Sequence, residues 1–348
     1  RMSSTAGSTP LDAVRSSCAA VAAKAEHVTI DDEEIARFLA ELDRKLWDRL
    51  VAVTGVPLRL EGEQRVNFWS LMALLQFGSG FRHELHEASD RGASDTIMYG
   101  LFGMHLGTER VTADYLASLS LHAVASLFDL RIDTETMVMP GVYRSEPSGP
   151  LADLATKIRD VLNETGKILK REGYETLGAF VLKHAVPAAE GGRPQAAPLV
   201  QALVDTFPAF ADRVEYKGEM VYLYKKAQLV AGELYRQMRE VDPSHFDFED
   251  VDQLTVYTDN VLPAVLRAKG ILRLSSELAA EVDSGGTLPA GPKEVELRAC
   301  AVEACERIVK ASDGTMTPLS LDYFLWTVGK EPEFRKLERH YTKDTIFY

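Results

Sequence analysis

Apolar positions recur every three or four residues along most of the chain, which is the spacing of one face of an α-helix. The apolar residues between Ile35 and Leu50 follow this spacing, and the acidic residues 31–33 before them favour a helix start. Residues 66–77 are apolar nearly all round, which predicts a central helix. The closely spaced glycines at 78–80 are expected to end it.

The second half of the chain shows the same periodicity. Pro150 opens a long amphipathic series, and residues 218–238 are apolar around most of a helix circumference. The latter are therefore expected to form one buried helix, with Lys225 in its middle. Strand signals are limited to short runs at 138–139 and 254–257. The pattern predicts an all-α fold with at most one short strand pair.

Loop signals divide this helical chain only weakly. Residues 188–198 are rich in Ala, Gly and Pro and form the best linker candidate, and 283–293 form a second loop. No internal repeat with a period of 20–50 residues is present. We expect a single elaborated helical domain over residues 1–348, in which the loop near 188–198 separates two helical lobes.

The composition of the chain limits which binding partners and which cellular compartment we expect. A formal net charge of −13 disfavours duplex nucleic acid, because phosphate neutralisation needs a basic surface. No apolar run is long enough for a membrane span. Residues 11–26 are interrupted by charges and cannot serve as a signal sequence, and the three cysteines form no CxxC pair. We expect a cytoplasmic protein that binds small molecules.

Two charged residues lie in apolar surroundings and are candidates for chemistry. Lys225 could reach the surface along its apolar stem, or it could be a functional lysine in a buried helix. Asp259 precedes a helix with Pro263 in its first turn, so it could simply be a helix cap. A carboxylate between two apolar stretches could also face a pocket and stabilise a developing cation. The residues alone leave both alternatives open.

Three further features favour structural interpretations. His83 and His86 are three residues apart, whereas the zincin motif needs histidines four apart, so no metal site is expected. Cys300 and Cys305 read as core, and Asp322 in its aromatic run reads as a paired core aspartate. Two predicted helices joined near Gly270 resemble a helix-hairpin-helix, a weak signal because many helix pairs share it.

An ordered series of sequence blocks resembles the queuosine salvage protein family from residue 74 to the C-terminus. Each block alone has little specificity, but their common order is specific. The blocks are LLQFGSGFR (74–82), TIMYGLFG (96–103), VTADYLASL (111–119), MVMPGVYR (137–144), VLNETGKIL (161–169), FPAFAD (207–212), YLYKKAQLVAGELY (222–235), LTVYTDNVLPAVLRAKGIL (254–272), KEVELRACAVEACE (293–306), LDYFLW (321–326) and TIFY (345–348).

The resemblance implies an all-α fold with a core similar to helix-hairpin-helix DNA glycosylases. It implies hydrolysis of queuosine 5′-monophosphate to queuine and ribose 5-phosphate, without metal or redox cofactor. The catalytic aspartate of the family falls on Asp259 and its active-site lysine on Lys225. The substrate-binding positions that it implies are Phe77, Ser79, Asn260, Asp322, Tyr323, His340 and Lys343.

Some positions depart from the family pattern. Gln76 stands where many members have Asn, Asn260 replaces a common tyrosine, and Val261 replaces a frequent basic residue. Thr327 stands where an aspartate is common, and the C-terminal segment carries fewer arginines than usual. These departures concern individual base and phosphate contacts more than the reaction.

Cleavage of a ribosyl C–N bond builds oxocarbenium charge on the sugar, which an ionised carboxylate can stabilise or attack. Asp259 suits this role, Lys225 suits either the departing base or the 5′-phosphate, and Asp322 suits the cationic amine of the queuine side chain. Two alternatives remain: a helix-hairpin-helix nucleic-acid glycosylase, and a non-catalytic helical scaffold. The scaffold predicts that Lys225 and Asp259 lie in solvent and far apart. Nothing in the pattern predicts a coiled coil, so we expect a monomer.

Overall fold

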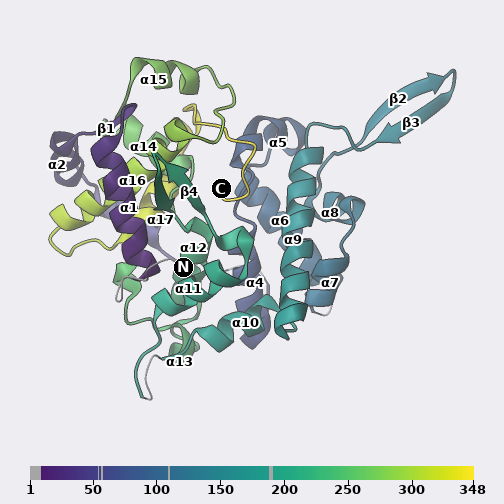
Figure 1. The fold of residues 1–348 in the computed structure, drawn as a ribbon, viewed down its shortest axis with the longest axis horizontal. Coiled ribbons are helices and arrows are strands. Elements are labelled where there is room, and N and C mark those ends of the chain that lie inside the picture. The colour runs from purple at the N-terminus through teal and green to yellow at the C-terminus, as the bar shows by residue number, and fades with distance from the viewer. Residues whose placement is uncertain (1–8, 54, 56–57, 109, 188–190) are drawn as a thin grey trace. The chain divides into compact units, whose positions relative to one another are not determined.

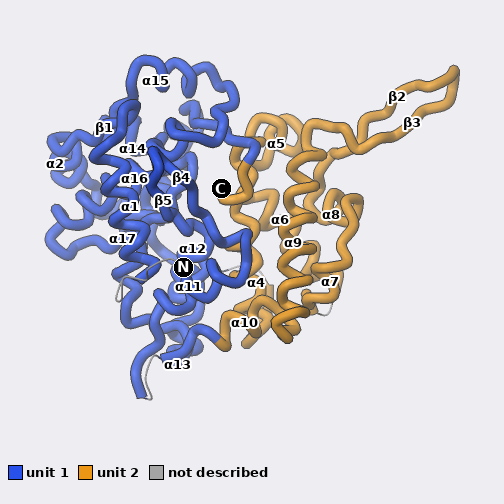
Figure 2. The backbone as a smooth tube through the Cα atoms, in the orientation of Figure 1, with its two compact units in different colours: residues 1–56, 184–344 blue, residues 57–183, 345–348 orange. Residues whose placement is uncertain are grey.

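The computed structural model describes residues 9–53, 55, 58–108, 110–187 and 191–348. The chain is mostly helical, as expected, but it also contains three two-stranded antiparallel sheets (Figure 1). It separates into two compact units (Figure 2). Unit 1 consists of residues 1–56 and 184–344, and unit 2 of residues 57–183 and 345–348. Residues 57–183 of unit 2 are therefore inserted between the two segments that build unit 1, and residues 345–348 join unit 2 from the C-terminal end.

Unit 1 contains most of the short elements and the 20-residue helix α16 (Pro292–Ala311). Its helices and strands are α1 (Pro10–Lys24), β1 (Val28–Ile30), α2 (Asp32–Ala40), α3 (Arg44–Val51), α11 (Ala196–Thr206), η2 (Pro208–Phe210), β4 (Arg213–Tyr216), β5 (Glu219–Tyr222), α12 (Lys225–Met238), α13 (Pro243–Phe246), η3 (Val251–Gln253), α14 (Val261–Ala268), β6 (Leu272–Leu274), α15 (Ser276–Asp283), α16 (Pro292–Ala311), α17 (Pro318–Val328) and α18 (Pro332–Arg335).

Helix α16 forms the centre of unit 1, because its small and apolar residues from Val295 to Ile308 are buried and let other helices approach it. Helices α1, α2, α14 and α17 all pack against it. Arg15 of α1 pairs with Glu306 of α16 at 3.0 Å between Nε and Oε2. Cys300 and Cys305 lie in this core, as predicted. The N-terminal helix thus completes a core that the C-terminal part of the chain provides.

The region predicted as one helix over 218–238 is instead a β-hairpin followed by a helix. Strands β4 and β5 pair in antiparallel register, with Tyr216 opposite Glu219. Lys217 and Gly218 both have positive φ, 49° and 81°, which is the conformation of a tight hairpin turn. Helix α12 then begins at Lys225, directly after Tyr224 at φ 48°. The prediction that Lys225 lies mid-helix was therefore wrong.

Unit 2 is built from helices and one hairpin. Its elements are α4 (Gly62–Leu74), η1 (Ser79–Phe81), α5 (Arg82–Ser89), α6 (Ala93–Gly107), α7 (Ala113–Ser118), α8 (Leu121–Phe128), β2 (Thr134–Met139), β3 (Val142–Glu146), α9 (Ala152–Glu172) and α10 (Leu177–His184). The predicted central helix is present as α4 and the long amphipathic helix as α9. Gly166 lets α9 approach α7 closely, since a Cβ there would lie 2.5 Å from the Ala113 carbonyl oxygen.

The two short β-type runs had different outcomes. Residues 138–139 lie at the end of β2, which pairs with β3, and every residue of this hairpin is exposed. Residues 254–257 were expected to form a strand but are buried without one. Their backbone is bound by side chains instead of by a neighbouring strand.

The expected helix-hairpin-helix is not confirmed. Helices α14 and α15 are joined by β6, which pairs with β1 in antiparallel register, Ile30 opposite Leu272. The chain returns from unit 2 to unit 1 after residue 183, shortly before the predicted loop at 188–198, of which residues 188–190 lie outside the described part. Among the described helices, none combines the length and apolar character that crossing a membrane requires.

Candidate active site

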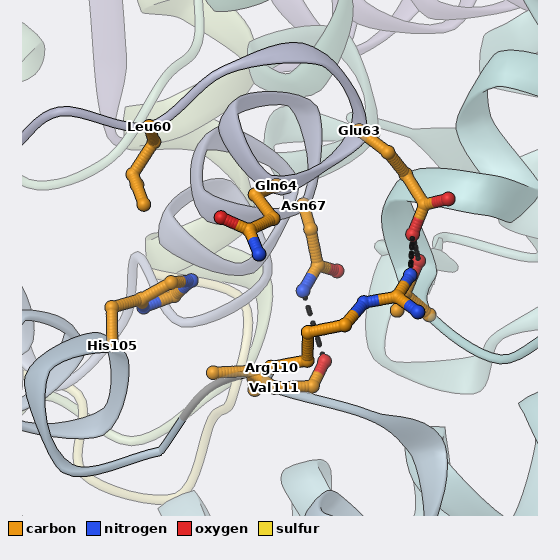
Figure 3. Close-up of a pocket in the computed structure, with 8 residues that line it drawn as sticks. Leu60, Glu63, Gln64, Asn67, His105, Arg110 and Val111 are labelled. Atoms are coloured by element: carbon orange, nitrogen blue, oxygen red, sulfur yellow. Dashed lines mark hydrogen bonds and ion pairs between the residues drawn. The ribbon is translucent and has the colours of Figure 1, made fainter.

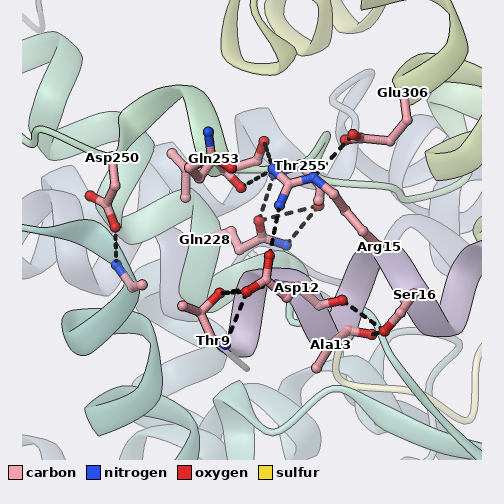
Figure 4. A network of polar contacts seen from close by, with 12 residues as sticks. Thr9, Asp12, Ala13, Arg15, Ser16, Gln228, Asp250, Gln253, Thr255 and Glu306 are labelled. Atoms are coloured by element: carbon pink, nitrogen blue, oxygen red, sulfur yellow. Dashed lines mark hydrogen bonds and ion pairs between the residues drawn. The ribbon is translucent and has the colours of Figure 1, made fainter. Parts of the chain in front are cut away.

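The buried segment 254–260 carries Asp259, and its main chain is held by side chains from helices of unit 1. Gln228 of α12 accepts a hydrogen bond from the Thr255 backbone N–H at 2.8 Å and donates to the Thr255 hydroxyl at 2.9 Å (Figure 4). Arg15 of α1 donates to the Gln253 carbonyl just before the segment (Figure 4). These side chains satisfy backbone groups that a strand partner would otherwise bind, which is why the segment can be buried without a sheet.

Asp322 of α17 binds the same segment. Its Oδ1 accepts a hydrogen bond from the Tyr257 backbone N–H at 2.6 Å. Burial raises the pKa of the Asp322 carboxyl to about 8, with the nearby charge of Asp259 adding to the shift and the Tyr257 hydrogen bond opposing it. In the free protein at neutral pH this carboxyl is mostly protonated. The expectation of a paired core aspartate describes this contact well.

Asp259 and Lys225 face each other at the starts of α14 and α12. Asp259 Oδ1 accepts from the backbone N–H groups of Val261 and Leu262, at 2.7 and 3.4 Å, so the side chain caps α14. Its Oδ2 lies 4.0 Å from Lys225 Nζ, and both side chains are at most 10% exposed. The scaffold alternative predicted these two groups in solvent and far apart, and the structure contradicts it.

Burial lowers the pKa of the Lys225 ammonium, and the charge of Asp259 opposes that shift. Arg298 lowers this pKa further, whereas Asp322 and Asp212 raise it. A lysine in this setting can change its charge closer to neutral pH than an exposed one. The pair therefore combines an anchored carboxylate with an amine whose proton is less tightly held.

Asp212 and Arg298 form a second buried charge pair that sequence reasoning missed. Arg298 Nη2 donates to Asp212 Oδ2 at 2.5 Å and to the Thr258 carbonyl at 3.2 Å. Arg298 lies one turn from Val295 and one turn from Val302, on the apolar side of α16. A charge on that side was the available signal, because a buried arginine needs a partner.

Tyr323 is positioned by polar groups of α12. Its hydroxyl donates a hydrogen bond to Glu233, and the Arg236 guanidinium lies 3.3 Å from the centre of its ring. Burial raises the pKa of the Glu233 carboxyl, and the Tyr323 hydrogen bond opposes that rise. In this structure the Tyr323 hydroxyl stabilises a buried carboxyl group.

The C-terminal segment of unit 1 contacts the Asp259 region through Asn260. The Asn260 amide Nδ2 donates to the His340 carbonyl at 3.1 Å. Burial, together with the charges of Arg298 and Arg339, lowers the pKa of the His340 imidazole to about 3. His340 is therefore neutral at physiological pH and brings no positive charge. Lys343 lies three residues further on and is half-buried.

Phe77 and Ser79 belong to unit 2, unlike the other seven predicted site residues. Phe77 is buried, and Gly78 between them has φ 98°, a conformation that suits glycine. The Gly78 N–H donates to the Tyr348 carbonyl at 3.0 Å within the same unit. The Ser79 hydroxyl is buried and has no hydrogen-bond partner among the described residues.

Three residues within two positions of Asp259 carry buried polar atoms without a hydrogen-bond partner among the described residues. They are the Tyr257 hydroxyl, the Thr258 hydroxyl and the Asn260 amide oxygen. Each of these residues is at most 3% exposed. Buried polar atoms normally have partners, so a concentration of exceptions beside one carboxylate is characteristic of a functional site.

The other predicted features give no further site. Within the described residues, no group of three His, Cys, Asp or Glu side chains could hold a metal ion. A small cavity of about 30 Å³ in unit 2 is lined by Glu63 and His105 among others (Figure 3). Glu63 there accepts hydrogen bonds from Arg110 and Thr176 at 2.8 and 2.7 Å. This volume suits one or two waters rather than a nucleotide, and none of the predicted site residues lines it.

Comparison with known proteins relates the chain to named relatives. A Sphaerobacter thermophilus protein named queuosine 5′-phosphate N-glycosylase/hydrolase is 31% identical over 246 residues, 70% of this chain and 67% of that protein. The Mus musculus protein of that name is 30% identical over 227 residues, 62% of this chain and 61% of its own. The Bos taurus protein is 25% identical over 363 aligned positions, 96% of this chain and 98% of its own.

The helical fold and the buried carboxylate–amine pair define a protein with a cluster of buried polar groups in unit 1. The sequence profile described as queuosine salvage protein matches residues 109–348. The chain belongs to the queuosine salvage protein family. All the predicted site residues except Phe77 and Ser79 lie within the matched range.

Proposed function

We propose that this protein hydrolyses the N-glycosidic bond of queuosine 5′-monophosphate and releases queuine for tRNA modification. The observation that carries the proposal is the buried Asp259–Lys225 pair, at 4.0 Å, in a chain of this family. The name shared by the three relatives, queuosine 5′-phosphate N-glycosylase/hydrolase, supports the same reaction.

In this reaction the C1′–N bond breaks, and its electron pair leaves with the base nitrogen, which gains a proton. The oxygen of a water molecule bonds to C1′ and loses a proton. Positive charge builds on the ribose while the bond breaks, and the carboxylate of Asp259 stabilises it. Its Oδ1 is already bound to two backbone N–H groups, so Oδ2 is our choice for the atom that faces the sugar.

We assign Lys225 to the glycosidic bond rather than to the 5′-phosphate. Its ammonium lies 4.0 Å from Asp259 Oδ2, the atom that we assign to the sugar. Its lowered pKa suits transfer of a proton to the departing base, whereas a phosphate-binding lysine is more useful when it keeps its charge. The proton that the base gains would then come from Lys225.

Seven further residues are proposed to contact the substrate. Asn260 offers its unpaired amide oxygen next to Asp259. Phe77 and Ser79 remain proposed contacts of the queuine base. Asp322 would bind the cationic amine of queuine as an ionised carboxylate. Binding would therefore have to overcome the raised pKa of this carboxyl group. The remaining proposed contacts are Tyr323, His340 and Lys343.

We also infer that the protein acts as a monomer in the cytoplasm, on a small molecule and without a metal or redox cofactor. The three cysteines are unpaired and buried, which fits a reducing compartment. Sedimentation of the purified protein across a range of concentrations tests the monomer.

A release assay tests the reaction and its site. The protein is incubated with queuosine 5′-monophosphate, and free queuine is followed by chromatography for wild type, Asp259→Asn and Lys225→Met. Asparagine keeps an Oδ1 acceptor for the α14 cap and removes only the charge, so the fold should persist. We expect kcat of Asp259→Asn to fall by about 10³-fold, with KM nearly unchanged. Undiminished kcat in this variant would refute the role of Asp259.

Queuosine without the 5′-phosphate separates the two roles of Lys225. If Lys225 acts at the glycosidic bond, Lys225→Met slows release from the nucleotide and the nucleoside by the same factor. If Lys225 binds the phosphate, the variant loses mainly its activity on the nucleotide. No queuine from folded wild-type protein would refute the proposed reaction itself.

A further inference from the structure

Asp212 links the chain segment before Lys225 to helix α16. Its backbone carbonyl accepts hydrogen bonds from the N–H groups of Leu223 and Tyr224, at 3.0 and 3.2 Å. Tyr224 has a positive φ of 48°, which a residue with a side chain adopts only when its surroundings hold it there. Lys225 follows directly. The Asp212 main chain therefore sets where α12 begins.

Arg298 links the side chain of Asp212 to the segment before Asp259. Its Nη1 and Nη2 donate to the two carboxylate oxygens of Asp212, at 3.2 and 2.5 Å. Its Nε and Nη2 donate to the Thr258 carbonyl, at 3.4 and 3.2 Å. Glu294 accepts a longer contact of 3.5 Å from Nη1. All three guanidinium nitrogens thus donate to protein acceptors, and the Thr258 carbonyl is part of the peptide bond that leads into Asp259.

We propose that Asp212 and Arg298 form a positioning clamp that holds Lys225 and Asp259 at their working separation. This inference rests on the proposed function. Both members of the clamp are at most 3% exposed. The two catalytic segments lie far apart in sequence, and their relative position depends on tertiary contacts of this kind. Neither clamp residue needs to touch the substrate, so both act through the residues that they hold.

The arginine is suited to the clamp by its shape as well as its charge. A planar guanidinium can bind a carboxylate with two N–H groups and still donate sideways to a carbonyl. A lysine ammonium could neutralise the charge of Asp212, but it could not form this set of hydrogen bonds to both the carboxylate and the carbonyl. Replacement by either lysine or an apolar residue should therefore let the Asp259 segment shift relative to Lys225, and a displacement near 1 Å can cost about 100-fold in rate.

The test measures queuine release, kcat and KM separately, together with the free energy of unfolding, for Asp212→Asn, Arg298→Lys and Arg298→Met. We expect kcat to fall by about 10- to 100-fold in each, with KM changed by less than about threefold. In the double variant Asp212→Asn/Arg298→Met, the loss of kcat should be well below the product of the single losses, because the two side chains act as one unit.

Glu296→Gln provides a matched control. Glu296 is a carboxylate on the same helix with 1% exposure, and it accepts from the backbone N–H groups of Glu26 and His27 and from the Tyr216 hydroxyl. None of these donors belongs to the segment that carries Asp259. This variant should lose stability while keeping kcat. It separates loss of the clamp from general destabilisation of α16.

The outcomes distinguish the clamp from the reaction. Wild-type turnover with undiminished kcat in the Arg298 variants overturns the clamp alone. A loss of kcat in Glu296→Gln as large as that in Arg298→Lys also overturns it, because the effect would then be one of stability. If Arg298→Met does not fold, Arg298→Lys decides. Absence of release from folded wild-type protein overturns the proposed function and the clamp together.

Discussion

The Asp322 carboxyl and the Tyr257 backbone N–H form a 2.6 Å hydrogen bond that attaches helix α17 to the segment carrying Asp259. The sequence places these residues far apart, in two apolar aromatic runs. Through this contact the Asp322 carboxyl group reaches the main chain of the segment that carries Asp259. Burial opposes ionisation of this carboxyl group, whereas the hydrogen bond from Tyr257 favours it.

Replacement of Asp322 by asparagine should change how stability depends on pH. The pKa of Asp322 is about 8 in the folded protein, above the ordinary value of 3.8, so the folded state binds the proton more tightly than the unfolded state. The wild-type free energy of unfolding therefore falls as pH rises from about 4 to about 8, by up to about 1.4 kcal/mol per pH unit. The free energy of unfolding of Asp322→Asn should not show this decline with rising pH. Urea unfolding of both proteins at pH 5 and pH 8 measures it, and parallel changes in the two proteins would contradict the prediction.

His340 should show the opposite sign. Its pKa is lowered to about 3 from 6.5, so the unfolded state binds the proton more tightly. The wild-type protein should therefore lose stability as pH falls from about 6.5 towards 3, and His340→Gln should show a shallower acid limb. The variant leaves the His340 carbonyl available to Asn260. Thermal unfolding from pH 7 to pH 4.5 checks the slope, and His122→Gln, which changes a largely exposed histidine, is the control.

Gly232 allows the Tyr257 ring to lie against α12. A Cβ at this position would meet the Tyr257 hydroxyl oxygen at 1.8 Å and Leu319 Cδ1 at 3.0 Å. Gly232→Ala should therefore destabilise the protein by about 1–3 kcal/mol through overpacking, and it should lower kcat because Tyr257 leads into the Asp259 segment.

Gly103→Ala is the matched control in helix α6. A Cβ there would make only contacts of 3.4 Å or longer. Because alanine favours a helix interior, this variant should be neutral or gain up to about 1 kcal/mol. Equal stability of the two alanine variants would show that the Tyr257 ring moves aside freely.

Tyr323→Phe should act mainly on stability. The change removes the hydroxyl that donates to buried Glu233, and an unsatisfied buried acceptor costs about 1–3 kcal/mol. KM for the nucleotide should stay close to the wild-type value. Denaturant unfolding and steady-state kinetics, measured on one preparation of each protein, test whether the variant changes stability or KM. A raised KM with unchanged stability would instead show that the Tyr323 hydroxyl, and not only the ring that phenylalanine retains, contacts the substrate.

Sequence periodicity predicted the long helices because they bury one continuous apolar face, as α9 does. It failed at the β4–β5 hairpin, because a run with apolar residues on most sides suits a buried helix as well as a hairpin followed by a helix. The decisive signal there was the turn at Lys217-Gly218, in which both residues have positive φ. Local propensity alone does not reveal such a turn when its first residue is a lysine.

The chemistry of the site was predictable in kind but not in geometry. Family resemblance selected Asp259 and Lys225, whose 4.0 Å separation arises from tertiary contacts that no local pattern encodes. Arg298 was missed although it lies on the apolar side of α16, because the sequence does not show that Asp212 is its buried partner. Asp322 was expected to meet a ligand, yet it accepts a hydrogen bond from the protein's own backbone.

The insertion of unit 2 has a consequence for biosynthesis. Helix α1 presents Leu11, Val14, Cys18 and Val21 to a core whose central helix, α16, begins at Pro292. A ribosome adding about 5–20 residues per second needs roughly a quarter of a minute to a minute to make the intervening chain. Strand β5 and helix α11, which also pack against α1, are made during this interval, whereas the contact of α1 with α16 forms only after it. The emerging N-terminal helix therefore keeps part of its apolar face uncovered until α16 has been made.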